Sequence, residues 1–108
     1  FAPIASYQLL EKAVETARDK GVRHHVGNVL SSDIFYNADT TASERLMRMG
    51  ILGVEIESSA LYMTAIYAGV EAFFVFTVID HFIHETSTTP EVRVRGFTYI
   101  IEIALSLV

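Results

Sequence analysis

An almost continuous apolar run, AFFVFTVI, occupies residues 72–79 and is interrupted only by Thr77. Its side chains are mostly β-branched or aromatic, which is typical of strands. A strand with one solvent-facing side alternates between apolar and polar residues, and this run does not alternate. It therefore predicts a strand that is covered on both faces, as a central strand of a parallel sheet is.

Helix signals are clearest near the two ends of the chain. Residues 6–20 carry apolar side chains at helical spacing, with Ser6 as the expected N-cap and Gly21 as the left-handed end. The last helix is expected to begin at a Thr89 cap that is followed by a proline and an early acid. The buried face expected for this last helix consists of Val94, Phe97, Ile100, Ile101, Ala104, Leu105 and Val108.

Shorter elements are expected between these segments. Helices are predicted at residues 43–49 and 57–68, each closed by a glycine, and strands at residues 22–30 and 51–56. The resulting order is αβαβαβα, which favours the α/β class with a mainly parallel or mixed sheet flanked by helices. Without an internal repeat, a low-complexity stretch or a linker, residues 1–108 are predicted to form a single unit.

Charge and composition argue against several classes of function. The net charge is −5 and only Arg93 and Arg95 lie close together, so no nucleic-acid partner is expected. The chain has no cysteine, which excludes disulfides and thiol catalysis and is compatible with the cytoplasm. No run approaches the roughly 20 apolar residues of a membrane span, and no membrane association is expected.

The histidines do not match a metal-binding pattern. His24 and His25 are adjacent in an expected strand and point in opposite directions, while His81 and His84 fall in an expected loop. No metal and no cofactor are therefore expected. Neither a glycine-rich phosphate loop nor the Gly-x-Ser-x-Gly turn of serine hydrolases occurs in the sequence.

Polar or aromatic residues follow each expected strand. They lie in residues 31–36, 55–58 and 80–88, and in open α/β sheets ligands bind beyond the carboxyl ends of the strands. Asp80 directly follows the apolar run, where a low dielectric raises the pKa of a carboxyl and suits it to be a general acid. The alternative is that Asp80 caps a helix or pairs with Arg93 or Arg95.

Glu55 and Glu57 form the second pair of candidate carboxylates. Residues two apart in a strand point to opposite faces, so these two do not act as one dyad unless the chain turns. A carboxylate accepts hydrogen bonds from both hydroxyls of a cis-diol, which makes a ribose a natural ligand. The alternative is one exposed carboxylate and one charge at a helix N-terminus.

Four stretches of the sequence resemble the purine nucleoside phosphorylase family of the hexameric, bacterial type, a branch of the nucleoside and uridine phosphorylases. They are VGNVLSSDIFY at residues 26–36, GILGVEIESSALY at 50–62, TVIDH at 77–81 and TTPEVR at 88–93. The resemblance covers essentially the whole chain and implies the nucleoside phosphorylase fold. A uridine phosphorylase or a nucleosidase shares that fold, but the motifs fit the purine class better.

The resemblance implies a role for each matching residue around the nucleoside. Phe35 matches the aromatic side chain that packs on the purine, and Val54 matches an apolar contact to the base. Glu55 and Ile56 lie in the motif that lines the base and the ribose. Glu57 matches the carboxylate that holds the ribose 2′- and 3′-hydroxyls.

The resemblance also implies an acid. Asp80 matches the general acid that protonates purine N7, and Arg93 matches the arginine that assists it. Three positions depart from the family pattern: Ile56 replaces a methionine, Ile79 a serine and Val92 a glutamate. Ile79 removes a hydroxyl beside the base, so it affects the expected orientation of the acid or the choice of purine.

The family further implies inorganic phosphate as the co-substrate, a cytoplasmic homo-oligomer built as a trimer of dimers, and a role in purine salvage. The sequence matches the C-terminal half of such an enzyme, so the phosphate-binding half is expected to be missing and the isolated chain is not expected to perform phosphorolysis. The alternative is a non-catalytic fragment of the same fold that binds nucleosides or serves assembly.

Overall fold

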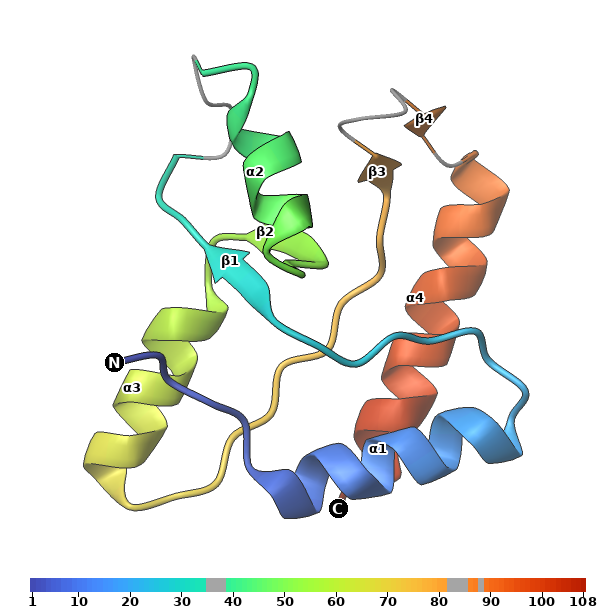
Figure 1. The fold of residues 1–108 in the computed structure, drawn as a ribbon. Helices are drawn as coiled ribbons and strands as arrows, with labels where there is room; N and C mark the ends of the chain where they lie inside the picture. The colour runs from blue at the N-terminus through green and yellow to red at the C-terminus, as the bar shows by residue number, and fades with distance from the viewer. Residues whose placement is uncertain (35–38, 82–85, 88) are drawn as a thin grey trace.

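Four helices and four short strands make up the described part of the computed structural model, which covers residues 1–34, 39–81, 86–87 and 89–108. They are α1 (Tyr7–Asp19), β1 (Val29–Ser31), α2 (Ala42–Arg48), β2 (Gly53–Glu55), α3 (Ser58–Ala68), β3 (Asp80–His81), β4 (Thr86–Ser87) and α4 (Pro90–Leu105). Figure 1 shows α1 running along one edge of the fold, with the C-terminal end of α4 lying behind the middle of α1.

The strands form two separate two-stranded sheets. β1 and β2 pair in parallel, with Ser31 opposite Glu55, whereas β3 and β4 pair antiparallel. Helices and a mixed set of strands confirm the predicted α/β class. Both strands of the parallel pair are shorter than the ranges that the sequence predicts, because pairing is limited to the three residues that lie opposite each other.

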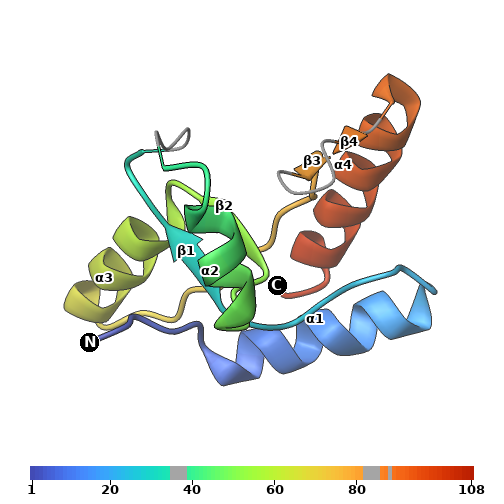
Figure 2. The same cartoon turned by 45° about the horizontal axis from the view of Figure 1, so that its top comes forward.

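The apolar run at residues 72–79 does not form the predicted central strand. It belongs to no strand of the structure, and its backbone bonds elsewhere: the Ala72 carbonyl accepts from Ser6 N at 2.8 Å, and Phe74 N donates to the Tyr62 hydroxyl at 3.1 Å. The segment passes between the parallel pair and α4, as both ribbon views show (Figures 1 and 2). The apolar composition of this segment favours burial. Side chains of neighbouring elements bury part of it, although its backbone does not pair with another strand.

Glycines set how closely this segment approaches its neighbours. A side chain on Gly96 in α4 would place its Cβ 2.7 Å from the Thr77 methyl group, and one on Gly53 would lie 3.7 Å from the Phe76 ring. The absence of a side chain at Gly96 therefore permits α4 to pack against residues 72–79. The run is held between β2 and α4 by close packing.

Capping signals predicted the helix ends well. The Ser6 hydroxyl accepts from Leu9 N at 3.4 Å, and the Thr89 hydroxyl accepts from Val92 N at 3.3 Å. Gly21, Gly50 and Gly69 have φ values of 66°, 80° and 71°, the left-handed conformation in which glycine carries no steric cost. The first three expected helices are present within about two residues of their predicted bounds, the usual uncertainty of helix ends. α4 begins directly after the predicted Thr89 cap but ends at Leu105, three residues before the end of its predicted apolar face.

The core lies where α1 meets the C-terminal part of α4. Ala13 and Ala17 of α1 and Ile103 of α4 are buried. Partly buried apolar side chains surround them, namely Val22, Phe73 and Leu107. At the edge of this contact the Thr16 and Ser106 hydroxyls are 2.9 Å apart, and a 3.2 Å ion pair joins Lys20 to Glu102. These contacts fasten the two ends of the chain to each other.

The predicted buried face of α4 is wrong. Val94, Ile101 and Leu105 are 64%, 58% and 66% exposed, and of the described helix residues only Ile103 is buried. α1 meets only the C-terminal part of α4 (Figure 2), and many apolar side chains of α4 are exposed in the described structure.

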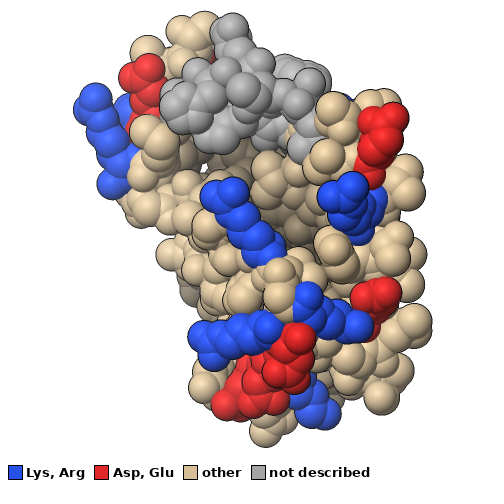
Figure 3. Space-filling model, turned by 90° about the vertical axis from the view of Figure 1, so that its right-hand side faces the viewer, with Lys and Arg blue, Asp and Glu red and all other residues tan. Residues whose placement is uncertain are grey.

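The charged side chains are interspersed on the face that Figure 3 shows, and neither sign forms a continuous area there. No helix in the described ranges combines the length and apolar character that are needed to cross a membrane.

Candidate functional site

The carboxyl ends of β1 and β2 meet at the start of α3. Ser31 and Glu55 are opposite each other in the parallel register, and Ser32 N donates to the Glu55 carbonyl at 2.9 Å. The Ser31 hydroxyl accepts from Ser59 N at 3.3 Å, which links β1 to the first turn of α3. Two of the three polar loops that the sequence singles out therefore converge, at the edge where open α/β sheets bind ligands.

The Glu55 carboxylate organises this junction. Its Oε2 atom accepts from the backbone N–H groups of Glu57 and Ser58 at 2.6 and 2.7 Å, and its Oε1 atom accepts from the Ser58 hydroxyl at 2.5 Å. These backbone N–H groups belong to the helix start, where intrahelical partners are missing. Glu55 thus ends β2 with its backbone and caps α3 with its side chain.

Two opposing effects act on the pKa of Glu55. Partial burial raises the pKa. Hydrogen bonds lower it by a larger amount in total, and they come from the Ser58 hydroxyl, from the Glu57 and Ser58 N–H groups and, with a smaller effect, from Ser31. The net pKa lies below the ordinary value of 4.5, so the carboxylate is ionised at neutral pH. An ionised carboxylate beside the positive end of a helix dipole is favourable.

Glu57 stands at the N-cap of α3 with a different environment. Its side chain is exposed and makes no capping hydrogen bond to its own helix. Ile56 beside it is 55% exposed, although its side chain is apolar, and Val54 is half-buried in β2. The turn from β2 to α3 therefore presents one apolar and one acidic side chain outward.

The other predicted site residues that the structure describes, Asp80 and Arg93, lie on other elements than the β2–α3 turn. Asp80 opens β3, where its backbone is opposite Ser87. Arg93 lies half-buried in the first turn of α4, and its backbone N–H donates to the Thr89 carbonyl at 3.0 Å. β3, β4 and the start of α4 lie side by side in both ribbon views. Phe35 lies outside the described residues.

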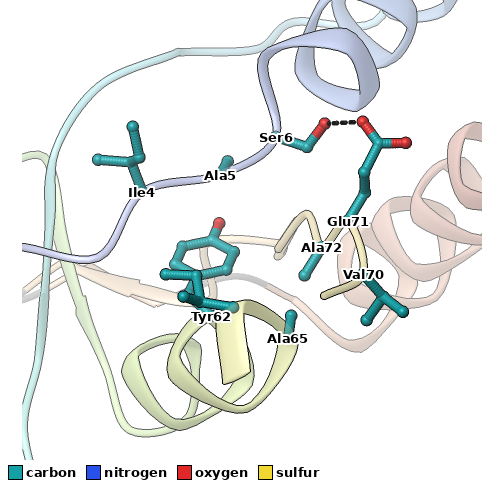
Figure 4. Close-up of a pocket in the computed structure, with 9 residues that line it drawn as sticks. Ile4, Ala5, Ser6, Tyr62, Ala65, Val70, Glu71 and Ala72 are labelled. Atoms are coloured by element: carbon teal, nitrogen blue, oxygen red, sulfur yellow. Dashed lines mark hydrogen bonds between the residues drawn. The ribbon is translucent and has the colours of Figure 1, made fainter. Parts of the chain in front are cut away.

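A cavity of about 320 Å³ lies on the side of α3 that faces the N-terminal segment (Figure 4). Tyr62 and Ala65 line it from α3, and Ser6 donates to Glu71 at 2.7 Å at its rim. Burial raises the pKa of Tyr62, whose hydroxyl accepts from Phe74 N. None of the predicted site residues whose side chains the structure describes lines this cavity.

In the described part of the chain, no group of three His, Asp or Glu side chains is arranged to hold a metal ion. The chemistry that the β2–α3 turn can offer is acceptance of hydrogen bonds by carboxylates and apolar contact by Ile56 and Val54.

The family model described as the phosphorylase superfamily matches residues 1–102. The chain is 44% identical over 107 residues to a purine nucleoside phosphorylase, DeoD-type, of Clostridium novyi, and 43% identical over 107 residues to its namesake in Alkaliphilus metalliredigens. A protein of the same name from Bacillus subtilis is 45% identical over 105 residues.

These matches take in nearly all of the chain but only part of each relative. They cover 99% of the chain and 46% of the Clostridium novyi protein, and 97% of the chain and 45% of the Bacillus subtilis protein. The chain therefore spans about half the length of the curated relatives it matches.

Proposed function

Because this chain belongs to the phosphorylase superfamily, we propose that it binds a purine nucleoside at the carboxyl ends of β1 and β2. The proposed reaction is phosphorolysis of the nucleoside to the free base and (deoxy)ribose 1-phosphate. The names of relatives that match nearly the whole chain support the substrate class. On the chain itself, the observation that carries the proposal is the exposed Glu57 carboxylate at the start of α3, beside the ends of two parallel strands.

Glu57 is the proposed ribose ligand. Its carboxylate has two oxygens, which suits it to accept from the adjacent 2′- and 3′-hydroxyls of the sugar. Its exposure leaves these oxygens accessible, in contrast to those of Glu55, which accept from the helix start. Glu55 belongs to the same motif and is proposed to take part in forming the ribose site.

The base is proposed to lie against apolar side chains. Ile56 and Val54 are contributed by the β2–α3 turn, and an exposed isoleucine next to a carboxylate is well suited to contact a heterocycle. Phe35 is proposed to pack on the purine, in keeping with the family motif in which it lies.

Asp80 is proposed to protonate the leaving purine at N7, with Arg93 assisting. The sugar becomes oxocarbenium-like as the bond to the base breaks, and a protonated base leaves more readily. Asp80 is opposite Ser87 in the β3–β4 pair, and α4, which carries Arg93 in its first turn, begins three residues after Ser87; this connection supports the pairing of roles. A shift of the α4 start would bring the arginine toward the acid.

Inorganic phosphate is the proposed co-substrate and no cofactor is proposed. The protein is proposed to work as a cytoplasmic homo-oligomer, the family hexamer, in purine salvage. Apolar side chains exposed along α4, such as Ile101 and Leu105, support association with further polypeptide.

Calorimetry with inosine and with adenosine tests nucleoside binding by the chain. The reaction is tested by mixing the chain with the part of the Clostridium novyi relative that it does not match, adding nucleoside and phosphate, and measuring free base by chromatography. We expect phosphate-dependent release of base and a loss of about 100-fold in rate on Asp80→Asn, the lower range for removing a general acid. Full activity of that variant would refute the acid role.

Nucleoside binding without phosphate-dependent turnover would instead identify a non-catalytic nucleoside-binding module. Ile79, which stands next to Asp80 in place of the family's serine, favours this second candidate. If the chain binds neither nucleoside nor free base, both candidates fail.

A further inference from the structure

We propose that Glu55 is a positioning residue, which holds the β2–α3 turn so that Glu57 faces the ribose, and that it is not itself a ribose ligand. The inference rests on the function proposed above. It differs from a role shared by the whole motif because it assigns the two glutamates to separate tasks.

The hydrogen bonds of Glu55 carry the first step. Oε2 accepts from two backbone N–H groups, at 2.6 and 2.7 Å, and Oε1 accepts from the Ser58 hydroxyl at 2.5 Å. A carboxylate oxygen has about two acceptor positions, so the two backbone N–H groups fully occupy Oε2. A sugar hydroxyl that bound Oε2 would have to displace a bond to the helix start.

The identity of the donors carries the second step. One of the two N–H groups belongs to Glu57 itself, so Glu55 fixes the backbone from which the Glu57 side chain projects. Ser58 supplies the other two donors and is only 4% exposed. If its hydroxyl turned away from the carboxylate, it would be buried without this hydrogen-bond partner, which is unfavourable. The Glu55 carboxylate therefore fixes the backbone from which the Glu57 side chain projects.

A third step comes from the neighbouring strand. The Ser31 hydroxyl accepts from Ser59 N, and the Glu55 carbonyl accepts from Ser32 N, so the turn is attached to β1 as well as to β2. Hydrogen bonds that support a ligand-binding group in this way fix its orientation, as they do for ligands of metal ions. Glu57 is thus held by both strands at whose ends it lies.

The two roles predict opposite effects of an amide at position 55. In Glu55→Gln the amide oxygen still accepts from the two backbone N–H groups, and the amide nitrogen donates to the Ser58 hydroxyl. A positioning residue is therefore rescued by glutamine. A residue that accepts from one sugar hydroxyl through each of its two carboxylate oxygens is not rescued, because glutamine replaces one of these acceptor oxygens with an NH2 donor.

The test is calorimetric titration of the chain and its variants with inosine and, separately, with the free base hypoxanthine. We expect Glu55→Ala to weaken inosine binding about tenfold, the lower range for lost supporting hydrogen bonds, with little change for hypoxanthine. Glu55→Gln is expected to stay close to the unmodified chain for both compounds. Glu44→Ala, an exposed glutamate in the first turn of α2, is the matched control and should change neither.

The outcomes separate this inference from the proposed function. If glutamine weakens inosine binding as strongly as alanine does, Glu55 is a direct ligand and the inference is overturned while the proposed function stands. Unchanged inosine binding in Glu55→Ala overturns it as well. If the unmodified chain binds neither compound, the proposed function fails and the inference fails with it. Should Glu55→Ala not fold, the glutamine variant alone still decides between the two roles.

Discussion

Glu55 and Glu57 are two residues apart, yet their carboxylates have different surroundings. The side chain of Glu55 turns back to the helix start, and that of Glu57 is exposed at the N-cap. The sequence left two arrangements open here, and the second of them, one exposed carboxylate and one charge at a helix N-terminus, describes the geometry. Spacing alone could not choose, because the strand ends at Glu55 and the chain turns immediately afterwards.

The lowered pKa of Glu55 makes stability depend on pH. A carboxyl whose pKa is lower in the folded than in the unfolded chain contributes stability that is complete above the unfolded value, here 4.5, and is lost as the pH falls through the folded value. We expect the free energy of unfolding to fall below pH 4.5 in urea titrations. Glu55→Gln should reduce that fall, whereas Glu44→Gln should leave it unchanged.

Asp39 adds to the same trend. The Arg45 guanidinium donates to its carboxylate at 2.6 Å, and with bonds from Thr41 it lowers the pKa of Asp39 to about 2. This group therefore loses its stabilising effect only at more acidic pH than most carboxyls. The contribution of Glu55 is the difference between Glu55→Gln and Glu44→Gln in how far the free energy of unfolding falls at acidic pH. An equal fall in both variants would contradict the assignment.

Helix ends were the part of the fold that the sequence predicted best, because capping depends on a few neighbouring residues. Ser6 and Thr89 accept from backbone N–H groups three residues ahead, as their positions indicated. Residues 72–79 and the buried face of α4 were not predicted, because they depend on which element lies opposite. An apolar side chain favours burial but does not specify the surface that buries it.

The Thr89 cap provides a test of the α4 start. Thr89→Ala removes the acceptor for Val92 N and should cost about 1 kcal/mol of stability. Urea denaturation followed by circular dichroism measures this difference. Thr98→Ala in the middle of the same helix is the control and should cost little, since its exposed hydroxyl bonds only within the helix. Equal effects of the two changes would argue against the cap.

Gly96 provides a test of the contact between α4 and the apolar run. A Cβ at this position lies 2.7 Å from the Thr77 methyl group, so Gly96→Ala should cost about 1–3 kcal/mol through overpacking, less the gain in helix propensity. Thermal unfolding measures the cost. Thr77→Ser removes that methyl group and should restore part of the lost stability in the double variant, and a lack of recovery would contradict the close contact.

The chain as a unit exposes more surface than a self-contained protein of its mass. Its accessible area is 8303 Å², whereas a folded monomer of this mass exposes about 6,000 Å². Its radius of gyration is 14.8 Å, compared with about 13 Å for a compact domain of this length. The excess area is of the size that protein–protein interfaces bury.

We therefore expect the purified chain to associate. Sedimentation velocity should give species heavier than the 12.0 kDa monomer, and a charge at the 66% exposed Leu105, as in Leu105→Lys, should reduce their share. Thr98→Lys adds the same charge at an exposed polar position and serves as the control. A monomer at every concentration would contradict the expectation.

Residues 72–79 do not pair with a strand, and this has a practical consequence for handling the protein. β-branched and aromatic segments whose main chain is not engaged in a sheet are templates for intermolecular cross-β pairing. Storage at high concentration is therefore expected to favour fibrils that begin from this segment. A lysine at the 62% exposed Val78 would act as a gatekeeper, and slower growth of thioflavin fluorescence would reveal it.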